Sequence, residues 1–98
     1  MTIRAVRFAD GADDDLVRLF EFLADHDLAT AERAFAAIRK GLAMAAAMPY
    51  SCRRAAGSSL VRECVISFGR SGYVAAFEIA EDAILVLAVR HQREDDFH

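Results

Sequence analysis

Three apolar runs, separated by two short polar turns, fill the last third of the chain. The runs span residues 60–69, 70–79 and 84–91. Runs of this length, rich in Val, Ile and Phe, are typical of strands, and the turns at 69–72 and 81–82 are short enough to join antiparallel neighbours. The pattern therefore predicts an antiparallel meander that carries the adjacent Arg90 and His91 at the end of its last strand.

The first half of the chain follows a helical period after one short alternating segment. Residues 3–8 alternate apolar side chains with arginines and predict a first strand. Four aspartates between Asp10 and Asp15 precede an apolar stripe of period three to four, which predicts a helix over about 13–24. Asp27 or Thr30 can cap a second, longer helix.

The second helix carries a stripe of small and apolar side chains and should end before Pro49. The stripe comprises Ala31, Ala34, Phe35, Ile38, Leu42 and Ala45. A short break before this helix predicts a helical hairpin, and residues 50–59 are predicted to be a loop. The expected fold is α+β, in the order β-α-α-β-β-β. The hairpin covers one face of a small, twisted, mainly antiparallel sheet. All 98 residues fit one domain, 1–98.

The charge balance narrows the classes of function. The formal net charge is −3, and this argues against a general nucleic-acid binder, which needs many cations to neutralise phosphates. Charge is unevenly spread, since six basic residues stand against the single acid Glu63 between Arg39 and Arg70. No apolar run reaches the length of a membrane span and no signal-peptide pattern opens the chain, so the expected location is cytoplasmic with no membrane partner.

Two cysteines and three histidines form no recognisable metal motif. Cys52 and Cys64 lack metal-ligand spacing, and we expect neither a metal nor a cofactor. Cys64 lies within a strand pattern and is interpreted as a buried small hydrophobe. Cys52 lies in the predicted loop and is interpreted as an incidental thiol.

Three groups of cations are candidates for chemistry. Arg62 falls on the apolar side of its strand, where it either forms an ion pair with a helix carboxylate or binds a phosphate or carboxylate. Arg90 and His91 either pair with the acidic residues that follow or, together with Arg62, supply a proton shuttle and cations for cleaving RNA. Arg53 and Arg54 either belong to a solvated loop or contact nucleic acid or an acidic partner.

These features resemble the RelE/ParE superfamily of bacterial toxins from type II toxin–antitoxin systems. The resemblance covers nearly the whole chain. It includes Pro49 at the end of the second helix, the 68–73 turn and, most specifically, the segment 86–98. The usual marks of the family are an arginine in the second strand, here Arg62, and an Arg-His pair that ends the last strand, here Arg90 and His91. The resemblance implies a growth-arresting toxin, often associated with plasmid stabilisation. A cognate, ParD-like antitoxin would neutralise it by folding a C-terminal segment onto it and would supply the contacts to operator DNA.

Two activities divide this superfamily. RelE-like members cut messenger RNA at the ribosome and are strongly basic, whereas ParE-like members inhibit DNA gyrase and need no catalytic residue of their own. This chain has a single lysine, Lys40, an acidic balance, and Phe97 where many nuclease relatives carry a tyrosine. The resemblance therefore favours a ParE-like gyrase inhibitor, with a RelE-like endoribonuclease as the alternative.

The site residues differ between the two branches. For the nuclease, the resemblance implies His91 as the proton-transfer group, with Arg62 and Arg90 steadying the phosphate; only in this case would the chain be an enzyme. For the gyrase inhibitor, the predicted contact residues are Arg53, Arg54, Arg90, His91 and Arg93.

Overall fold

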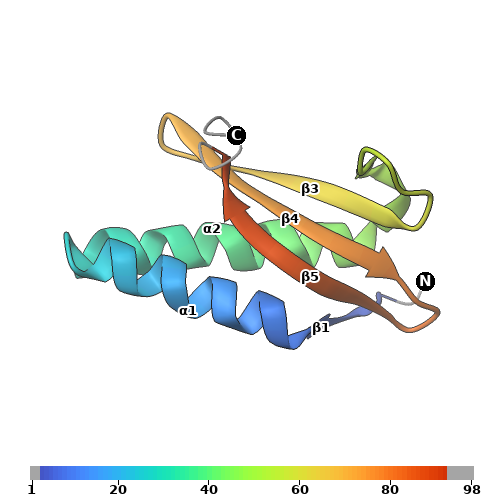
Figure 1. Ribbon diagram of the computed structural model, residues 1–98, viewed down its shortest axis with the longest axis horizontal. Coiled ribbons are helices and arrows are strands. Elements are labelled where there is room, and N and C mark those ends of the chain that lie inside the picture. Colours follow the sequence, from blue (N-terminus) through green and yellow to red (C-terminus); the bar gives the residue numbers. More distant parts are fainter. Residues whose placement is uncertain (1–2, 93–98) are drawn as a thin grey trace.

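The computed structural model describes residues 3–92 and shows two helices packed against one face of a five-stranded sheet (Figure 1). The elements in chain order are β1 (Ala5–Phe8), α1 (Asp10–Ala24), α2 (Leu28–Ala47), the single 3₁₀ turn η1 (Pro49–Ser51), β2 (Arg53–Arg54), β3 (Val61–Phe68), β4 (Ser71–Ile79) and β5 (Ala83–His91). The predicted α+β fold and its element order are confirmed.

The sheet has the strand order β1-β5-β4-β3-β2. β3, β4 and β5 form the predicted antiparallel meander, and β1 joins it as a parallel neighbour of β5, with Ala5 opposite Ala83 and Phe8 opposite Val86. β2 was not predicted. It consists of two residues of the expected loop, which pair with β3 at Arg62 and Glu63.

Both helices begin where acidic side chains favour the free N–H groups of a first turn. α1 starts at Asp10, three residues before the predicted start, with Asp10 and Asp13 in its first turn. α2 is capped by Asp27, whose carboxylate accepts hydrogen bonds from Ala29 N–H at 3.1 Å and Thr30 Oγ1 at 2.7 Å. Of the two predicted caps, Asp27 is therefore the one used. The hydrogen bond from Thr30 is the main cause that lowers the pKa of Asp27.

The core lies between the helical hairpin and the inner face of the sheet. Its largest fully buried side chains are Ile38, Tyr73, Phe77, Ile84, Val86 and Val89. Gly41 brings α2 close to β3, since a Cβ at this position would lie 2.6 Å from Cγ1 of Ile66. The absence of a side chain at Gly41 therefore sets how near the helix can approach the sheet.

The side chain of Asp15 continues the hydrogen bonding to the edge of β5 where β1 ends. Ala9 N–H still donates to Val86 O at 2.9 Å, but the chain then turns into α1 and leaves the edge of β5. Asp15 Oδ2 accepts the N–H of Val89 at 3.0 Å and so replaces the missing strand partner. One face of α1 is thereby fixed to β5.

Candidate functional site

Strand alternation separates the three residues proposed for RNA cleavage. Arg62 lies opposite Phe77 and His91 opposite Tyr73, so both lie on the inner, helix-covered side of the sheet. These two positions on β4 are four residues apart, about 13 Å along a strand. Arg90 is adjacent to His91 in sequence and therefore projects from the opposite, outer face. The structure does not bring Arg62, Arg90 and His91 into one cluster.

Arg62 is engaged with the backbone of the segment before β2. Its Nη1 donates to Cys52 O at 2.7 Å and to Tyr50 O at 3.2 Å, and its guanidinium lies 5.2 Å from the centre of the Tyr50 ring. Of the two roles considered for Arg62, an ion pair with a helix carboxylate is not among its contacts within residues 3–92. Two carbonyl oxygens and an aromatic face accept the charge instead, and they tie η1 to β3.

Arg90 and Arg53 both pair with Glu63 on the outer face. Arg53 Nε donates to Glu63 Oε1 at 3.0 Å, while Arg90 Nη2 lies 3.9 Å from Glu63 Oε2. We call Arg53, Glu63 and Arg90 the outer cluster. Two cations around one carboxylate leave this part of the face net positive, so it can attract an acidic surface.

His91 is held at the inner end of β5. Its Nε2 lies 3.0 Å from Ser71 Oγ, and its ring packs edge-on against Tyr73, with centroids 5.4 Å apart. Tyr73 is almost fully buried, and burial raises the pKa of its hydroxyl. His91 is therefore anchored by the Ser71 hydroxyl and by the ring of the buried Tyr73.

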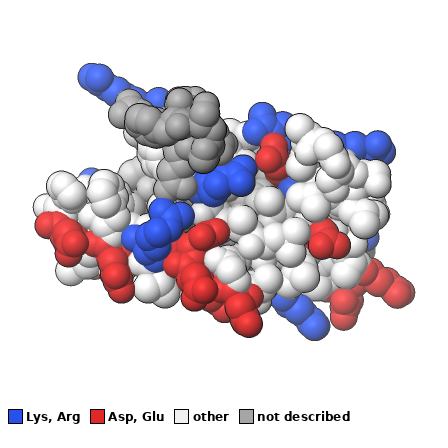
Figure 2. Space-filling model, viewed as in Figure 1, with Lys and Arg blue, Asp and Glu red and all other residues white. Residues whose placement is uncertain are grey.

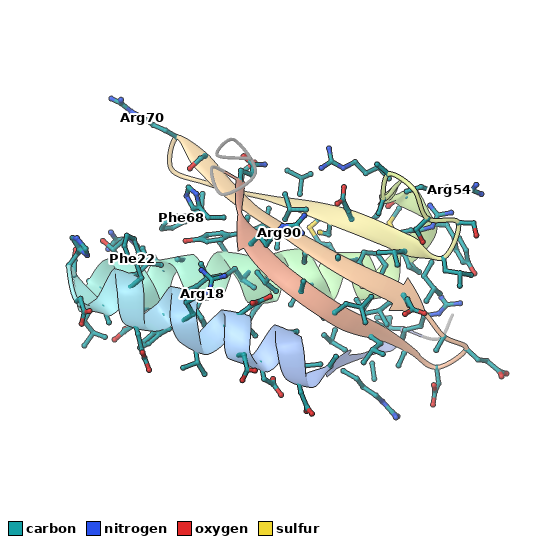
Figure 3. The ribbon with its side chains drawn as sticks, viewed as in Figure 1. Arg18, Phe22, Arg54, Phe68, Arg70 and Arg90 are labelled. Carbon is teal, nitrogen blue, oxygen red and sulfur yellow. The ribbon has the colours of Figure 1, made fainter. Side chains whose placement is uncertain are left out.

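Basic side chains are spread along the whole length of the molecule (Figure 3). Arg54 lies at the β2 end and Arg70 at the β3–β4 turn, at opposite ends of the long axis (Figure 3). Figure 2 shows acidic side chains gathered along α1, with the basic ones mostly elsewhere. The uneven charge seen in the sequence thus forms no single basic patch in this view, and Arg93 lies outside the described residues.

A groove runs between the end of α2 and β3. Its volume is about 430 Å³, and its lining residues are Gly41, Met44, Ala45, Met48, Ser51, Cys52, Arg53, Glu63, Cys64 and Val65. Met44 and Met48 are each about two-thirds exposed, and Val65 is also exposed. Apolar side chains that stay accessible beside a concave surface mark a site for another molecule.

The groove is bordered by an open strand edge. β2 pairs with β3 only at Arg62 and Glu63, and within residues 3–92 no strand pairs with the outer edge of β3 beyond Cys64. An exposed edge of this kind can accept an added strand through its backbone N–H and C=O groups. Groove and edge together provide side-chain contacts and backbone hydrogen bonds in one place.

No three His, Cys, Asp or Glu side chains among residues 3–92 gather as a metal site would require. No helix in this part is both long and apolar enough to cross a membrane.

Sequence reasoning missed Glu63, Tyr50 and the two methionines of the groove. The sequence pattern does not indicate a role for Glu63, because its partner Arg90 is 27 residues away in the chain and comes close only when the sheet forms. Tyr50 follows Pro49, in the segment 50–59 that the sequence predicts to be a loop. Met44 and Met48 stand four residues apart at the end of α2, and this spacing could have indicated an exposed apolar face.

Comparisons with known proteins agree with this architecture. The family model that matches the chain describes the ParE toxin of the type II toxin–antitoxin system parDE, and it covers residues 6–96. Among solved structures, the chain resembles one from the chromosomal ParDE TA system of P. aeruginosa, with a TM-score of 0.75 and 15% identity. That match covers 91% of this chain and 96% of the other, and at this identity it shows a shared fold. No curated protein sequence matches.

Proposed function

The chain belongs to the ParE toxin family and is the toxin component of a type II toxin–antitoxin system, and from this premise we propose that it arrests growth by inhibiting DNA gyrase. Inhibition by binding needs a recognition surface and no proton-transfer group. A cognate, ParD-like antitoxin neutralises it, and operator DNA is contacted through that antitoxin.

The separation of Arg62, Arg90 and His91 is the observation that carries this proposal. General acid–base cleavage of RNA requires the proton-transfer group and the phosphate-binding cations within hydrogen-bond reach of one phosphate. Here Arg62 is engaged with two backbone carbonyls, and Arg90 projects from the opposite face to His91. This arrangement supports binding over ribosome-dependent RNA cleavage.

The outer cluster is the part of the predicted contact set that we assign to the target. Arg53 and Arg90 share Glu63 on the face of the sheet that the helices leave uncovered. Charged residues on a rigid strand surface are well suited to steer and orient a large partner. Arg54 lies opposite Arg62, so it projects to the other side of the sheet from Arg53. His91 likewise projects to the other side from Arg90, and neither Arg54 nor His91 belongs to this outer surface.

The groove and the open β3 edge are the proposed docking site of the antitoxin. An antitoxin segment that folds on binding buries apolar side chains against Met44, Met48 and Val65. Its backbone can add a strand to the edge of β3 beyond Cys64. This site lies beside the outer cluster, since Arg53 and Glu63 belong to both. A bound antitoxin would therefore also cover part of the proposed target surface.

Controlled expression in a bacterial host tests the target class. Gyrase inhibition should produce filamentation and DNA-damage signalling, and co-expression of the antitoxin encoded beside the toxin should restore growth. Growth arrest with normal cell length and cleaved transcripts would contradict the gyrase proposal and support the nuclease.

A further inference from the structure

Cys52 and Cys64 lie opposite each other at the end of the β2–β3 ladder. The register pairs Arg54 with Arg62 and Arg53 with Glu63. The next position in this antiparallel register places Cys52 opposite Cys64, and the backbone of Cys52 is still extended, with φ −80° and ψ 149°. The structure has both cysteines as free thiols.

The hydrogen-bond pattern brings these two side chains close together. Ala55 N–H donates to Val61 O at 2.8 Å, which makes this pair hydrogen-bonded. Because the two kinds of antiparallel pair alternate, Cys52 and Cys64 fall at a non-hydrogen-bonded position, where Cα atoms are about 4.5 Å apart and side chains approach most closely. That separation lies within the range of about 4.4–6.8 Å that a disulfide accepts.

The two thiols differ in access but share one groove. Both line the groove beside α2, where Cys52 is half-buried and Cys64 is 9% exposed. Cys64 Sγ lies 3.6 Å from Gly41 O, to which it donates. Burial is the main cause that raises the pKa of Cys64 to about 11, and the adjacent Cys52 sulfur adds to it. The Cys52 thiol can therefore react with a reagent in solution, while the Cys64 thiol lies buried next to it.

We propose that Cys52 and Cys64 form an oxidisable thiol pair that a low-molecular-weight disulfide, such as oxidised glutathione, converts to an intramolecular disulfide. The Cys52 thiolate attacks one sulfur of the small disulfide, and the first glutathione thiolate leaves. The Cys64 thiolate then attacks the Cys52 sulfur and releases the second glutathione. The protein loses two protons and two electrons, and one oxidised glutathione becomes two reduced molecules.

The second step distinguishes this pair from a solitary surface thiol. A single half-buried cysteine would retain the attached glutathione, which would then fill part of the groove. Cys64 removes this adduct because it lies directly opposite the modified sulfur. The assignment rests on strand register and burial, and it does not depend on which target the toxin inhibits.

Mass spectrometry of the whole folded chain after incubation with oxidised glutathione tests the proposal. We expect the native protein to lose about 2 Da with no stable adduct, and proteolysis to give one linked peptide pair containing Cys52 and Cys64. Cys64→Ser should instead accumulate an adduct of about 305 Da on Cys52, while Cys52→Ser should stay largely unmodified.

Two results would overturn the assignment. One is a stable glutathione adduct on Cys52 of the native chain, and the other is a native chain that remains reduced under conditions that oxidise a control dithiol. The measurement on the native chain shows whether the disulfide forms even if one of the variants does not fold.

Discussion

At the scale of single residues, the partners of each arginine indicate its role better than its position in the sequence. Arg62 donates to two carbonyl oxygens that precede β2 and stacks on Tyr50, so its charge is used inside the protein. Arg53 and Arg90 share Glu63 on the outer face and remain accessible to a partner. The arginines that the sequence identified as candidates therefore divide into one that is used inside the protein, Arg62, and two that we propose for recognition, Arg53 and Arg90.

Replacing Arg62 should lower stability more than it changes recognition. Arg62→Ala removes the donors that bridge Tyr50 O and Cys52 O, and charge-assisted hydrogen bonds of this kind contribute about 1.5–3 kcal/mol. We expect the free energy of unfolding, measured by urea denaturation, to fall by about 2 kcal/mol. Arg54→Ala, at an exposed position on β2, is the matched control and should change it by less than about 0.5 kcal/mol. Equal values for the two variants would contradict the structural role.

The Cys64 thiol should make stability depend on pH in the alkaline range. Its pKa is raised from 9.0 to about 11 in the folded protein, so between these values the unfolded chain has lost a proton that the folded chain keeps. Stability must then fall as pH rises from 9 to 11, by about 1–2 kcal/mol from this group. The difference between the native chain and Cys64→Ala, measured by denaturation across this range, isolates the effect. A difference that does not change with pH would argue against the buried thiol.

At the scale of elements, the sequence predicted what local pattern determines and missed what depends on distant partners. Apolar periodicity placed both helices and the meander, because each must bury one stripe or face. The early start of α1 was missed, since Ala9 offers no capping side chain and the turn is held by Val86 O. β2 was missed because two residues carry no periodicity, and their pairing is supplied by β3.

The candidate site was predicted less completely than the fold. Residue types identified the cations, but whether they converge depends on which face of the sheet each one occupies. Arg90 and His91 illustrate this, because adjacent strand residues project to opposite sides. The groove could not be predicted either, since it forms where α2, which ends at Ala47, packs against β3, which begins only at Val61.

Asp15 provides the test of how α1 is fixed to the sheet. Asp15→Ala leaves the N–H of Val89 without its carboxylate acceptor, and we expect a loss of about 1–3 kcal/mol in the free energy of unfolding. Asp14→Ala is the control, since Asp14 is exposed on the same helix. Hydrogen exchange at Val89 should accelerate in the first variant alone. Unchanged protection there would show that the carboxylate does not hold this edge.

The groove beside α2 can be tested without unfolding the protein. Met44→Glu places a charge on an exposed apolar lining position, so the fold should tolerate it while a docked apolar segment should not. We expect affinity for the antitoxin, measured by calorimetry, to fall at least about tenfold, which is about 1.4 kcal/mol. Val17→Glu is the control on the exposed surface of α1. Equal affinity for Met44→Glu and the native toxin would place the antitoxin elsewhere.

At the scale of the whole molecule, one small fold combines an inner sheet face covered by two helices with an outer face that we propose for recognition. The helices cover the inner side, and the open β3 edge and the outer cluster lie on or beside the surface that the helices leave accessible (Figure 1). The same fold serves more than one activity in this superfamily, so the fold alone does not fix the target. The positions of Arg62, Arg90 and His91 distinguish the two activities, and their separation favours inhibition by binding over RNA cleavage.

Supercoiling by purified DNA gyrase, assayed beside message cleavage on programmed ribosomes, tests the central claim most directly. The comparison uses the native toxin and His91→Gln, in which the amide can keep the hydrogen bond to Ser71 but cannot exchange protons near neutral pH. We predict that both proteins inhibit supercoiling equally, that the antitoxin reverses the inhibition, and that neither cleaves message. Ribosome-dependent cleavage by the native toxin, falling on the order of 100-fold or more in His91→Gln, would contradict the account.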